Sequence, residues 1–502
     1  MSCNYRISYF LSQFLKPLIK DAPTTCDSTE DLLSRVDDCN NSTDLNGYIV
    51  GSMDVEALYP SIDISFACEK CEELLNDSDL EFANVDYEEL GLFLAFTNSS
   101  EQLDSHNFTN YCPSRKTHLG RPPLLVACGT SADREERWKS WIPPRENPPD
   151  SIKRKMVIRA IMTSIETTMR NHVFFFNQDA YHQTEGGAIG VGLAGEVANL
   201  FMVWWDRTFI ERVIENGIEL AMYGRYVDDT DVVAKSIDEN AEAPDRKTME
   251  RLQEIANAIH PSIRVTIDYP SNHPDNRLPV LDVTQWIGDV EVNGEKQKKI
   301  LHSHFMKEMS NRLVIRRDSA LSMRSKVNIL VADLVRVMRN VSRLCPPEER
   351  DRHVQYYVWR MQYSGYTSSE RLQVYRRAKG KYLAMLENHQ NNTVPLYRSK
   401  MWNKVERSDE KLRKKRDWYK QGGYDSVMFV DATPGGELMT TFESIIREVK
   451  LPIRIVERSG DSIKEMVVKS NPFKRHRCEC EVCQLGRKDE VNCKGRENLC
   501  TN

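Results

Sequence analysis

The sequence lacks an uninterrupted apolar run of the length that a lipid bilayer requires. Its 502 residues are 40% hydrophobic and 28% charged, and no apolar stretch reaches the roughly 18 residues typical of a membrane-spanning helix. The first twenty residues carry Arg6, Lys16 and Lys20 without a continuous apolar segment. This pattern argues against a secretory signal and leaves a mitochondrial presequence open. Internal repeats and low-complexity tracts are also missing, so we expect a globular protein of about two to four domains and no membrane partner.

Positive charge is scarce in the first part of the chain and abundant later. Residues 1–110 contain 5 Lys and Arg against 21 Asp and Glu, whereas residues 301–420 contain 27 against 12. A basic excess spread over so many residues predicts contact with a polyanion. The alternative is a set of solvated helix faces.

Cysteine is unevenly distributed among its thirteen positions. Eight cysteines are scattered between Cys3 and Cys345, as expected of reduced thiols. Because no secretory signal is predicted, a disulfide framework is disfavoured. The remaining cysteines suit four thiolates around zinc, with Cys478 as a possible substitute for one of them. The alternative is a disordered tail with reactive thiols. The four predicted zinc ligands are Cys480, Cys483, Cys493 and Cys500.

Apolar spacing predicts a mixed order of helices and strands. The predicted helices cover most of residues 1–48, with a start at Ser28, and residues 151–176, 186–213, 247–260 and about 319–420. A capping box, unless it is a chance match, is predicted at Thr367 and Glu370. The predicted strands are residues 49–55, two around a turn in 221–234, residues 262–268, and two or three in 278–304. Residues 85–150 are expected to be irregular, including 141–149, and a small α/β unit is expected over about 424–470, with a strand at Ser426–Val430.

Three acidic residues at the ends of predicted strands suggest metal-dependent chemistry. Tyr226-Val-Asp-Asp229 lies between apolar runs and predicts a hairpin with its turn at Asp228-Asp229, although Asp is also common in plain turns. Asp54 ends an earlier strand, and Tyr59 follows five residues later. Mg²⁺ prefers hard oxygen ligands, and two such ions can stabilise both oxygens of an in-line phosphoryl displacement.

A glycine-rich segment lies between the two acidic segments. Gln183-Thr-Glu-Gly-Gly-Ala-Ile-Gly190 precedes an apolar helix, and glycines let the backbone approach a base pair or a sugar closely. Taken alone, the segment is better explained as a packed loop before a core helix. The order of the three segments is more specific than any one of them.

These three segments resemble motifs A, B and C of the reverse transcriptase palm. The flanking segments narrow the resemblance to the Penelope-like element reverse transcriptases, relatives of telomerase, and the likeness covers most of the chain except about residues 75–150. Val191 and Gly192 depart from the family, in which Ser and Pro are usual. The flanking segments that carry the resemblance are Tyr5–Leu18, Leu278–Val283, Phe429–Gly435 and Ser470–Phe473.

The resemblance implies a role for each motif residue. Asp54 and Asp228 would bind both catalytic magnesium ions, with support from Asp229 and a further contact from the backbone carbonyl of Val55. Tyr59 would be the sugar gate that favours deoxynucleotides. The residues implied to bind the nucleotide and template are Tyr59, Gln183, Gly186, Gly190 and Tyr226.

We therefore predict an α+β right-hand polymerase palm with a helical thumb. The expected domains are partial fingers or palm-entry helices (1–48), the palm (49–304) with an insertion at about 75–150, a basic thumb (305–420), a small α/β unit (421–470) and a Cys-rich zinc tail (471–502). The thumb aromatics Tyr356, Tyr357, Trp359 and Tyr375 are expected in the core rather than on a base-stacking surface. Its cations, expected to contact phosphates, include Arg336, Arg339, Arg343, Arg376, Arg377 and Lys379.

The expected activity is RNA-directed DNA synthesis by a retroelement protein. The partners would be an RNA template, a DNA primer and deoxynucleotide triphosphates, and the location would be intracellular, with the nucleus favoured. One alternative is an inactive or domesticated fragment that binds nucleic acid without catalysis. Another is an RNA-dependent RNA polymerase, against which Tyr59 argues.

The resemblance also predicts that this sequence is a fragment that polymerises poorly. In the resembled family the fingers precede the segment that matches Tyr5–Leu18, and a GIY-YIG endonuclease follows the Cys-rich linker. Residues 1–48 contain only four bases, Arg6, Lys16, Lys20 and Arg35, and offer no cradle for a triphosphate. The competing expectation is a compact enzyme in which the insertion replaces the fingers.

Overall fold

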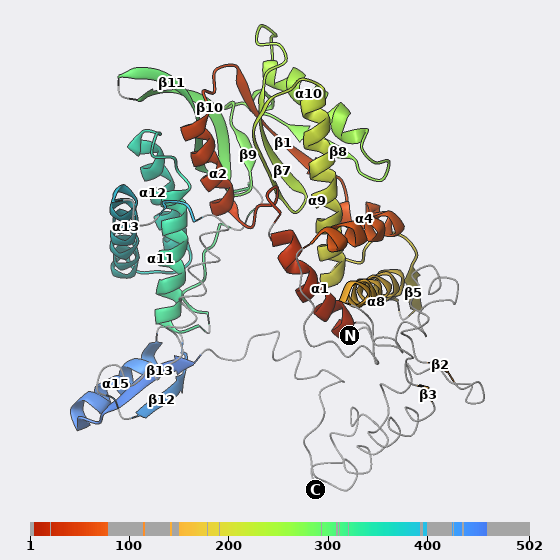
Figure 1. The fold of residues 1–502 in the computed structure, drawn as a ribbon. Helices are drawn as coiled ribbons and strands as arrows, with labels where there is room; N and C mark the ends of the chain where they lie inside the picture. Colours follow the sequence, from red (N-terminus) through yellow and green to blue (C-terminus); the bar gives the residue numbers. More distant parts are fainter. Residues whose placement is uncertain are drawn as a thin grey trace. The chain divides into compact units, whose positions relative to one another are not determined.

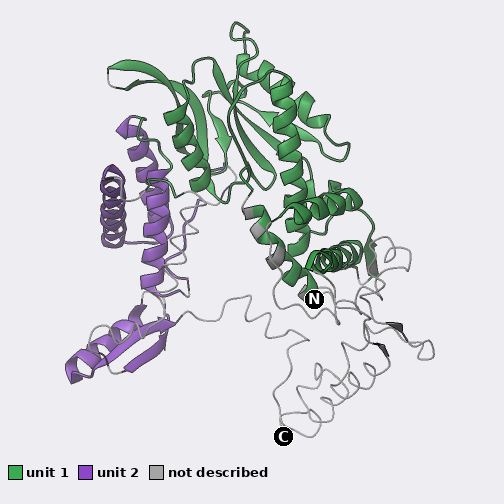
Figure 2. Cartoon of the chain, viewed as in Figure 1, with its two compact units in different colours: residues 1–306, 340–345, 395–404 green, residues 307–339, 346–394, 405–502 purple. Residues whose placement is uncertain are grey.

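The computed structural model describes most of the chain up to residue 458. The described residues are 5–78, 150–398 and 424–458, with gaps at 21, 178, 190, 293, 308–309, 311, 320, 392–394, 425 and 434–435, together with 114–115 and 141–142. They form two compact units (Figure 2). The first unit contains residues 1–306, 340–345 and 395–404, and the second contains residues 307–339, 346–394 and 405–502.

A four-stranded antiparallel sheet is the centre of the first unit. Its strands lie in the order β6 (Leu220–Tyr226), β7 (Asp229–Lys235), β1 (Tyr48–Val55) and β8 (Val265–Asp268). The strands are rich in Val, Ile, Met and Tyr with turn residues between them, as strand propensity requires. The strands predicted at 49–55, 221–234 and 262–268 are confirmed.

The two faces of this sheet pack against different layers (Figure 1). Alternate residues of β1 point to opposite faces: Val50 packs on one side with α2 (Thr29–Ser42), β9 (Leu278–Val280) and β11 (Glu295–His304). On the other side, Met53 and Val55 pack against helices that form the larger core. Those helices are α1 (Tyr5–Lys20), α4 (Ile64–Asp77), α8 (Asp150–Arg170), α9 (Gly192–Glu215) and α10 (Pro244–Asn257).

Local signals explain where several of these helices begin. The Ser28 side chain accepts a hydrogen bond from the Asp31 amide and caps α2, and Asp63 caps α4 in the same way through the Phe66 amide. Such caps satisfy amides that have no partner within the helix. Helix α9 is buried around much of its circumference, which explains its nearly continuous apolar sequence. The predicted start of α2 at Ser28 is confirmed.

In the part of the second unit that the structure describes, three long helices precede a small α/β element. Helices α11 (Met323–Arg339), α12 (Pro347–Tyr363) and α13 (Ser368–Gln390) share one apolar core. The predicted capping box is present, because the Thr367 side chain binds the Glu370 amide and the Glu370 side chain binds the Thr367 amide. Strands β12 (Ser426–Asp431) and β13 (Ile453–Arg458) pair in parallel, with α15 (Glu437–Val449) between them in sequence.

The remaining short elements connect these layers. In the first unit, β10 (Val283–Val292) pairs with β9 and β11 as a second antiparallel sheet, which confirms strands in 278–304. The helices α3 (Leu58–Ser61) and η2 (Pro270–Asn272) follow β1 and β8. Among the described residues, no helix is long and apolar enough to cross a membrane.

Three predictions of local structure were wrong. The helix predicted over 151–176 ends at Arg170, because the β-branched and aromatic run His172–Phe176 forms β4, which pairs with β5 (Asp179–Gln183). The segment 141–149 was expected to be irregular, but β3 (Trp141–Ile142) pairs with β2 (Ser114–Arg115). The hairpin turn lies at Val227-Asp228, one residue before the predicted Asp228-Asp229.

Candidate active site

The three predicted acids meet where β1 and the β6–β7 hairpin end. Asp54 on β1 is directly opposite Asp229 on β7 in the antiparallel register. The Val55 amide donates a hydrogen bond to the Asp228 carbonyl, with a nitrogen–oxygen distance of 3.3 Å. Asp54 and Asp229 are exposed, and Asp228 is half-buried. Residues separated by 174 positions in the sequence therefore lie next to each other.

The pairing of Asp54 with Asp229 is electrostatically unfavourable by itself. Side chains directly opposite each other in an antiparallel pair lie on the same face, and like charges there destabilise the sheet. Divalent cations between the carboxylates would reverse the sign of this interaction, and the oxygen donors suit magnesium. In the described part of the chain, no three His, Cys, Asp or Glu side chains are already arranged as a metal site, so the magnesium ions stay a prediction.

The turn Val227-Asp228, which contains one of these acids, has an unusual backbone. Val227 has a φ of +60°, a region that β-branched residues rarely adopt. Arg225 stabilises this conformation by donating a hydrogen bond from Nη1 to the Val227 carbonyl at 2.7 Å. The position of Asp228 therefore depends on a side chain three residues earlier.

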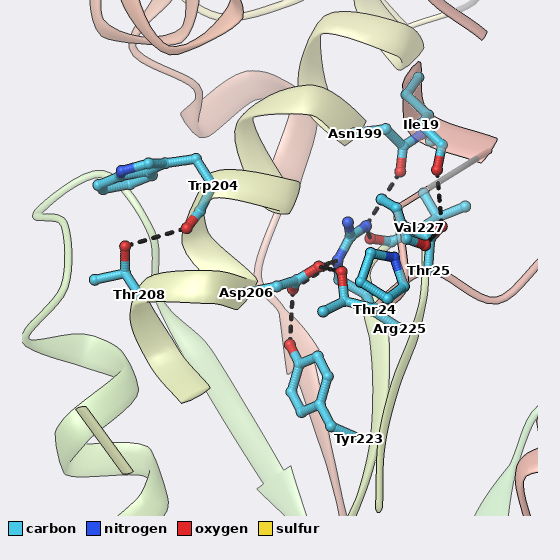
Figure 3. Close-up of polar contacts among 12 residues, drawn as sticks. Ile19, Thr24, Thr25, Asn199, Trp204, Asp206, Thr208, Tyr223, Arg225 and Val227 are labelled. Atoms are coloured by element: carbon cyan, nitrogen blue, oxygen red, sulfur yellow. Dashed lines mark hydrogen bonds and ion pairs between the residues drawn. The ribbon is translucent and has the colours of Figure 1, made fainter. Parts of the chain in front are cut away.

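A buried polar network anchors Arg225 on the helical side of the sheet (Figure 3). Its Nε donates to both carboxylate oxygens of Asp206 on α9, at 2.9 and 3.0 Å, and both side chains are fully buried. The Asp206 carboxylate also accepts hydrogen bonds from Thr24 at 2.8 Å and Tyr223 at 2.7 Å. Burial and the neighbouring Asp206 raise the pKa of Tyr223, which keeps its hydroxyl a donor. The network joins the N-terminal segment, α9 and β6.

Tyr59 lies between the acidic site and helix α9. It follows Ala57, which has a φ of +48° and turns the chain from β1 into α3. Burial, Asp228 and Glu196 raise the pKa of the half-buried Tyr59, and a Cβ added at Gly195 would lie 3.8 Å from its hydroxyl oxygen. The predicted sugar-gate residue is therefore neutral and held between the tandem acids and the start of α9.

Two glycines bring the glycine-rich segment against the same loop. Gly186 has a φ of +66°, and a Cβ there would lie 2.3 Å from the Pro60 carbonyl oxygen. The Gly187 amide donates to the Tyr59 carbonyl at 2.7 Å. The packing thus requires glycine at position 186. This contact with Pro60 fits the packed-loop alternative, and approach to a base pair or sugar stays a prediction.

Two other predicted nucleotide contacts lie at the ends of strands β5 and β6. Gln183 ends β5, and its Nε2 donates to the Glu185 carbonyl in its own turn at 2.9 Å. Tyr226 is exposed at the end of β6 and pairs with Asp229. Gly190 and the cysteines at 480, 483, 493 and 500 lie outside the described residues.

The second unit displays aromatic side chains that the sequence analysis assigned to the core. Tyr357 is buried, as predicted. Tyr356, Trp359 and Tyr363 are 39%, 40% and 68% exposed and form a continuous row along α12, with ring centroids 5.6 and 5.3 Å apart. We call these three residues the α12 aromatic row. Helical spacing explains the split, because residues three or four apart share a face and Tyr357 lies on another.

Comparisons with known proteins add little to these observations. Searches of protein families and of curated proteins found no match. Among solved structures, the chain is similar to telomerase from Candida albicans in complex with a TWJ fragment of telomeric RNA, with a TM-score of 0.41 and 11% identity. The match covers 74% of this chain and 52% of that chain, so the chain spans about half the length of that structure. Similarity this weak supports no conclusion about function. A proposal about function therefore has to rest on the geometry of the site.

Proposed function

We propose that the first unit carries the catalytic palm of an RNA-directed DNA polymerase, of the kind found in Penelope-like retroelements. The observation that supports this most directly is the register that pairs Asp54 with Asp229 and links Val55 to Asp228. Two carboxylates directly opposite each other destabilise the end of the sheet, and divalent cations bound between them would remove that cost. An antiparallel sheet that presents three acids at one end is suited to two-metal nucleotidyl transfer.

Each residue of this site has a separate role in the proposed reaction. Asp54, Asp228, Asp229 and the Val55 carbonyl would hold two magnesium ions, which when bound supply charge stabilisation for the attacking and leaving oxygens. Tyr59 would close the space beside the sugar and exclude a ribose 2′-hydroxyl. Gly186 would keep the loop close enough for the backbone to border the base pair, with Gln183, Gly190 and Tyr226 as further contacts.

Features of the second unit support nucleic-acid binding. Residues 323–339 and 346–390 contain twelve Lys and Arg against six Asp and Glu, and cations of this kind bind phosphates in a salt-dependent way. The α12 aromatic row offers ring faces on which bases can stack. The RNA template and the DNA primer are the partners we propose. We also propose that Cys480, Cys483, Cys493 and Cys500 bind one zinc ion.

The alternative is a protein that binds nucleic acid without catalysis. It is favoured by one observation, namely that no metal site is already arranged among the described residues. Under this alternative the basic helices would still bind nucleic acid, and the acids would be dispensable.

Primer extension by the full chain distinguishes the two. A DNA primer annealed to an RNA template is incubated with deoxynucleotides or ribonucleotides and Mg²⁺, and binding of the same duplex is measured in parallel. Wild-type protein should extend the primer with deoxynucleotides, and Asp228→Asn should bind but not extend, because a lost ligand removes most of the charge stabilisation. Asp289→Asn, which changes an exposed acid on β10, is the matched control. Binding without extension by all three proteins, the wild type included, would support the alternative, and equal extension by Asp228→Asn and the wild type would refute the proposed site.

A further inference from the structure

Arg225, a buried residue behind the acids of the candidate site, contacts the turn that carries Asp228. Arg225 lies on the face of β6 that packs against α9, and its side chain is fully buried. The acids lie on the opposite face, since Asp229 pairs with Tyr226 and not with Arg225. The hydrogen-bonded route from Arg225 to the acids therefore runs through the backbone of the turn.

Two hydrogen bonds of the Arg225 side chain connect it to the turn and to α9. Nη1 of Arg225 donates to the Val227 carbonyl at 2.7 Å and to Oδ1 of Asn199 at 3.1 Å. Val227 immediately precedes Asp228 and is held at a positive φ. Strained residues of this kind persist only where surrounding contacts over-determine them.

The anchor of Arg225 is equally specific. The Asp206 carboxylate fixes Nε, and the donors Thr24 and Tyr223 fix the carboxylate in turn. The Arg225 backbone is also held, because its amide donates to the Thr24 carbonyl and its carbonyl accepts from the Cys26 amide. Because both the guanidinium and the backbone of Arg225 are fixed, its hydrogen bond to Val227 can fix the position of the turn.

We propose that Arg225 is a positioning residue that holds Val227 in its left-handed conformation and so aims Asp228 and Asp229 at Asp54, with Asp206 as its anchor. The inference rests on the proposed function only in treating the turn as the catalytic one. Lysine at this position keeps the charge but lacks the planar fork that reaches Asp206 and Val227 together.

The test combines Arg225→Lys with two changes at Val227. Glycine adopts a positive φ at no steric cost, so Val227→Gly should reduce the need for the restraint. Val227→Ala removes the same methyl groups but retains the penalty for positive φ, and is the matched control. A merely structural role of Arg225 would not distinguish glycine from alanine.

Two readouts are measured on the full chain. The first is hydrogen exchange of the Val55 amide, which donates to the Asp228 carbonyl and reports the turn position without any activity. The second is primer extension, resolved into kcat and the KM for primer–template. Arg225→Lys should speed Val55 exchange and lower kcat by at least about tenfold, since a misplacement of about 1 Å can cost about 100-fold. The KM for primer–template should change by less than about twofold, because uniform binding is untouched.

Recovery of both readouts in Arg225→Lys/Val227→Gly, but not in Arg225→Lys/Val227→Ala, would establish the role. Unchanged exchange and kcat in Arg225→Lys, or equal recovery by glycine and alanine, would overturn it. If the wild-type protein extends no primer, the proposed function fails, and the exchange readout alone decides the positioning role. If Arg225→Lys does not fold, Asn199→Ala removes one acceptor of Nη1 and should shift both readouts in the same direction, by a smaller factor; no shift there would also overturn the proposal.

Discussion

Tyr397 donates a hydrogen bond to Nε2 of His302 at 3.2 Å, inside the first unit. Nδ1 of the same ring donates to the Asn340 carbonyl at 2.9 Å, so the two contacts together fix a neutral tautomer. Burial lowers the pKa of His302 to about 4. Three segments that are far apart in the sequence are joined through a ring that must stay uncharged.

Stability of the first unit should therefore fall in mild acid. The folded pKa of His302 lies below its unfolded value of about 6.5, so its contribution is fully present above about pH 6.5 and is lost as the pH falls toward 4. The loss should approach about 1.4 kcal/mol per pH unit. His302→Gln keeps a donor and an acceptor but does not titrate, and urea unfolding at a series of pH values should show a flatter profile. Parallel profiles for the two proteins would contradict this.

Neutralising Asp54 should stabilise the protein when no divalent metal is present. Asp54→Asn removes the repulsion with Asp229, and a cross-strand pair contributes about 0.2–1 kcal/mol. Asp289→Asn is the control with the opposite sign, because Asp289 is opposite Lys298 and forms an ion pair with it at 3.0 Å. Unfolding in EDTA measures both effects. Added Mg²⁺ should stabilise the wild type more than Asp54→Asn, through ligand linkage, and an equal metal effect on both would exclude Asp54 as a ligand.

Gly186→Ala should be far more damaging than Gly217→Ala. Both glycines have positive φ, which costs other residues about 1–2 kcal/mol, but nothing lies within 4 Å of a Cβ at Gly217, whereas the Pro60 carbonyl is in the way at Gly186. The excess loss at Gly186 should appear in unfolding curves and, because the loop borders Tyr59, in primer extension. Equal losses for the two variants would show that the contact with Pro60 is unimportant.

Tyr59→Ala should raise the incorporation of ribonucleotides relative to deoxynucleotides. The ring would otherwise clash with a 2′-hydroxyl, and its removal takes away a contact that disfavours the wrong sugar. Tyr59→Phe keeps the ring and should preserve selectivity. Competing-nucleotide assays measure the ratio, and a ratio that is the same in all three proteins would place the sugar gate elsewhere.

Trp359→Ala should weaken binding of single-stranded nucleic acid by about 5- to 150-fold, since stacking on an aromatic ring is worth about 1–3 kcal/mol per base. Leu372→Ala, at an exposed aliphatic side chain on α13, is the control and should change affinity little. The slope of affinity with salt should be unchanged by Trp359→Ala, because no phosphate contact is lost. Binding measured by fluorescence anisotropy at several salt concentrations tests both statements, and an unaffected affinity would show that the α12 aromatic row has another role.

The sequence predicted the parts of the site that depend on local patterns. Asp54 could be placed at the end of a strand because a short apolar run precedes it, and Asp228 could be placed in a hairpin turn because apolar runs flank the tandem acids. Gly186 could be identified because it lies in a glycine-rich turn before a helix and because the order of the three segments resembles the palm motifs.

The rest of the site depends on contacts between distant residues. The turn was predicted one residue late, because Asp tolerates positive φ better than Val, and the contact from Arg225 to Val227 overrides that preference. Asp206 and Thr24 were missed for the same reason, as they are 182 positions apart. A signal did exist: Arg225 follows Met222-Tyr-Gly, and Asp206 follows the apolar run Leu200–Trp205. Charges next to such segments are rarely buried unless they are paired.

The short segment Thr24–Cys26 has a consequence for solubility. Strand β6 is at one end of the four-stranded order, and an uncovered strand edge offers backbone groups with which another molecule can pair. The amide and carbonyl of Arg225 are instead occupied by Thr24 and Cys26. A shortened protein that began after residue 26 would expose this edge next to the tandem acids, and we expect it to self-associate through β6 even if the core of the first unit still folded.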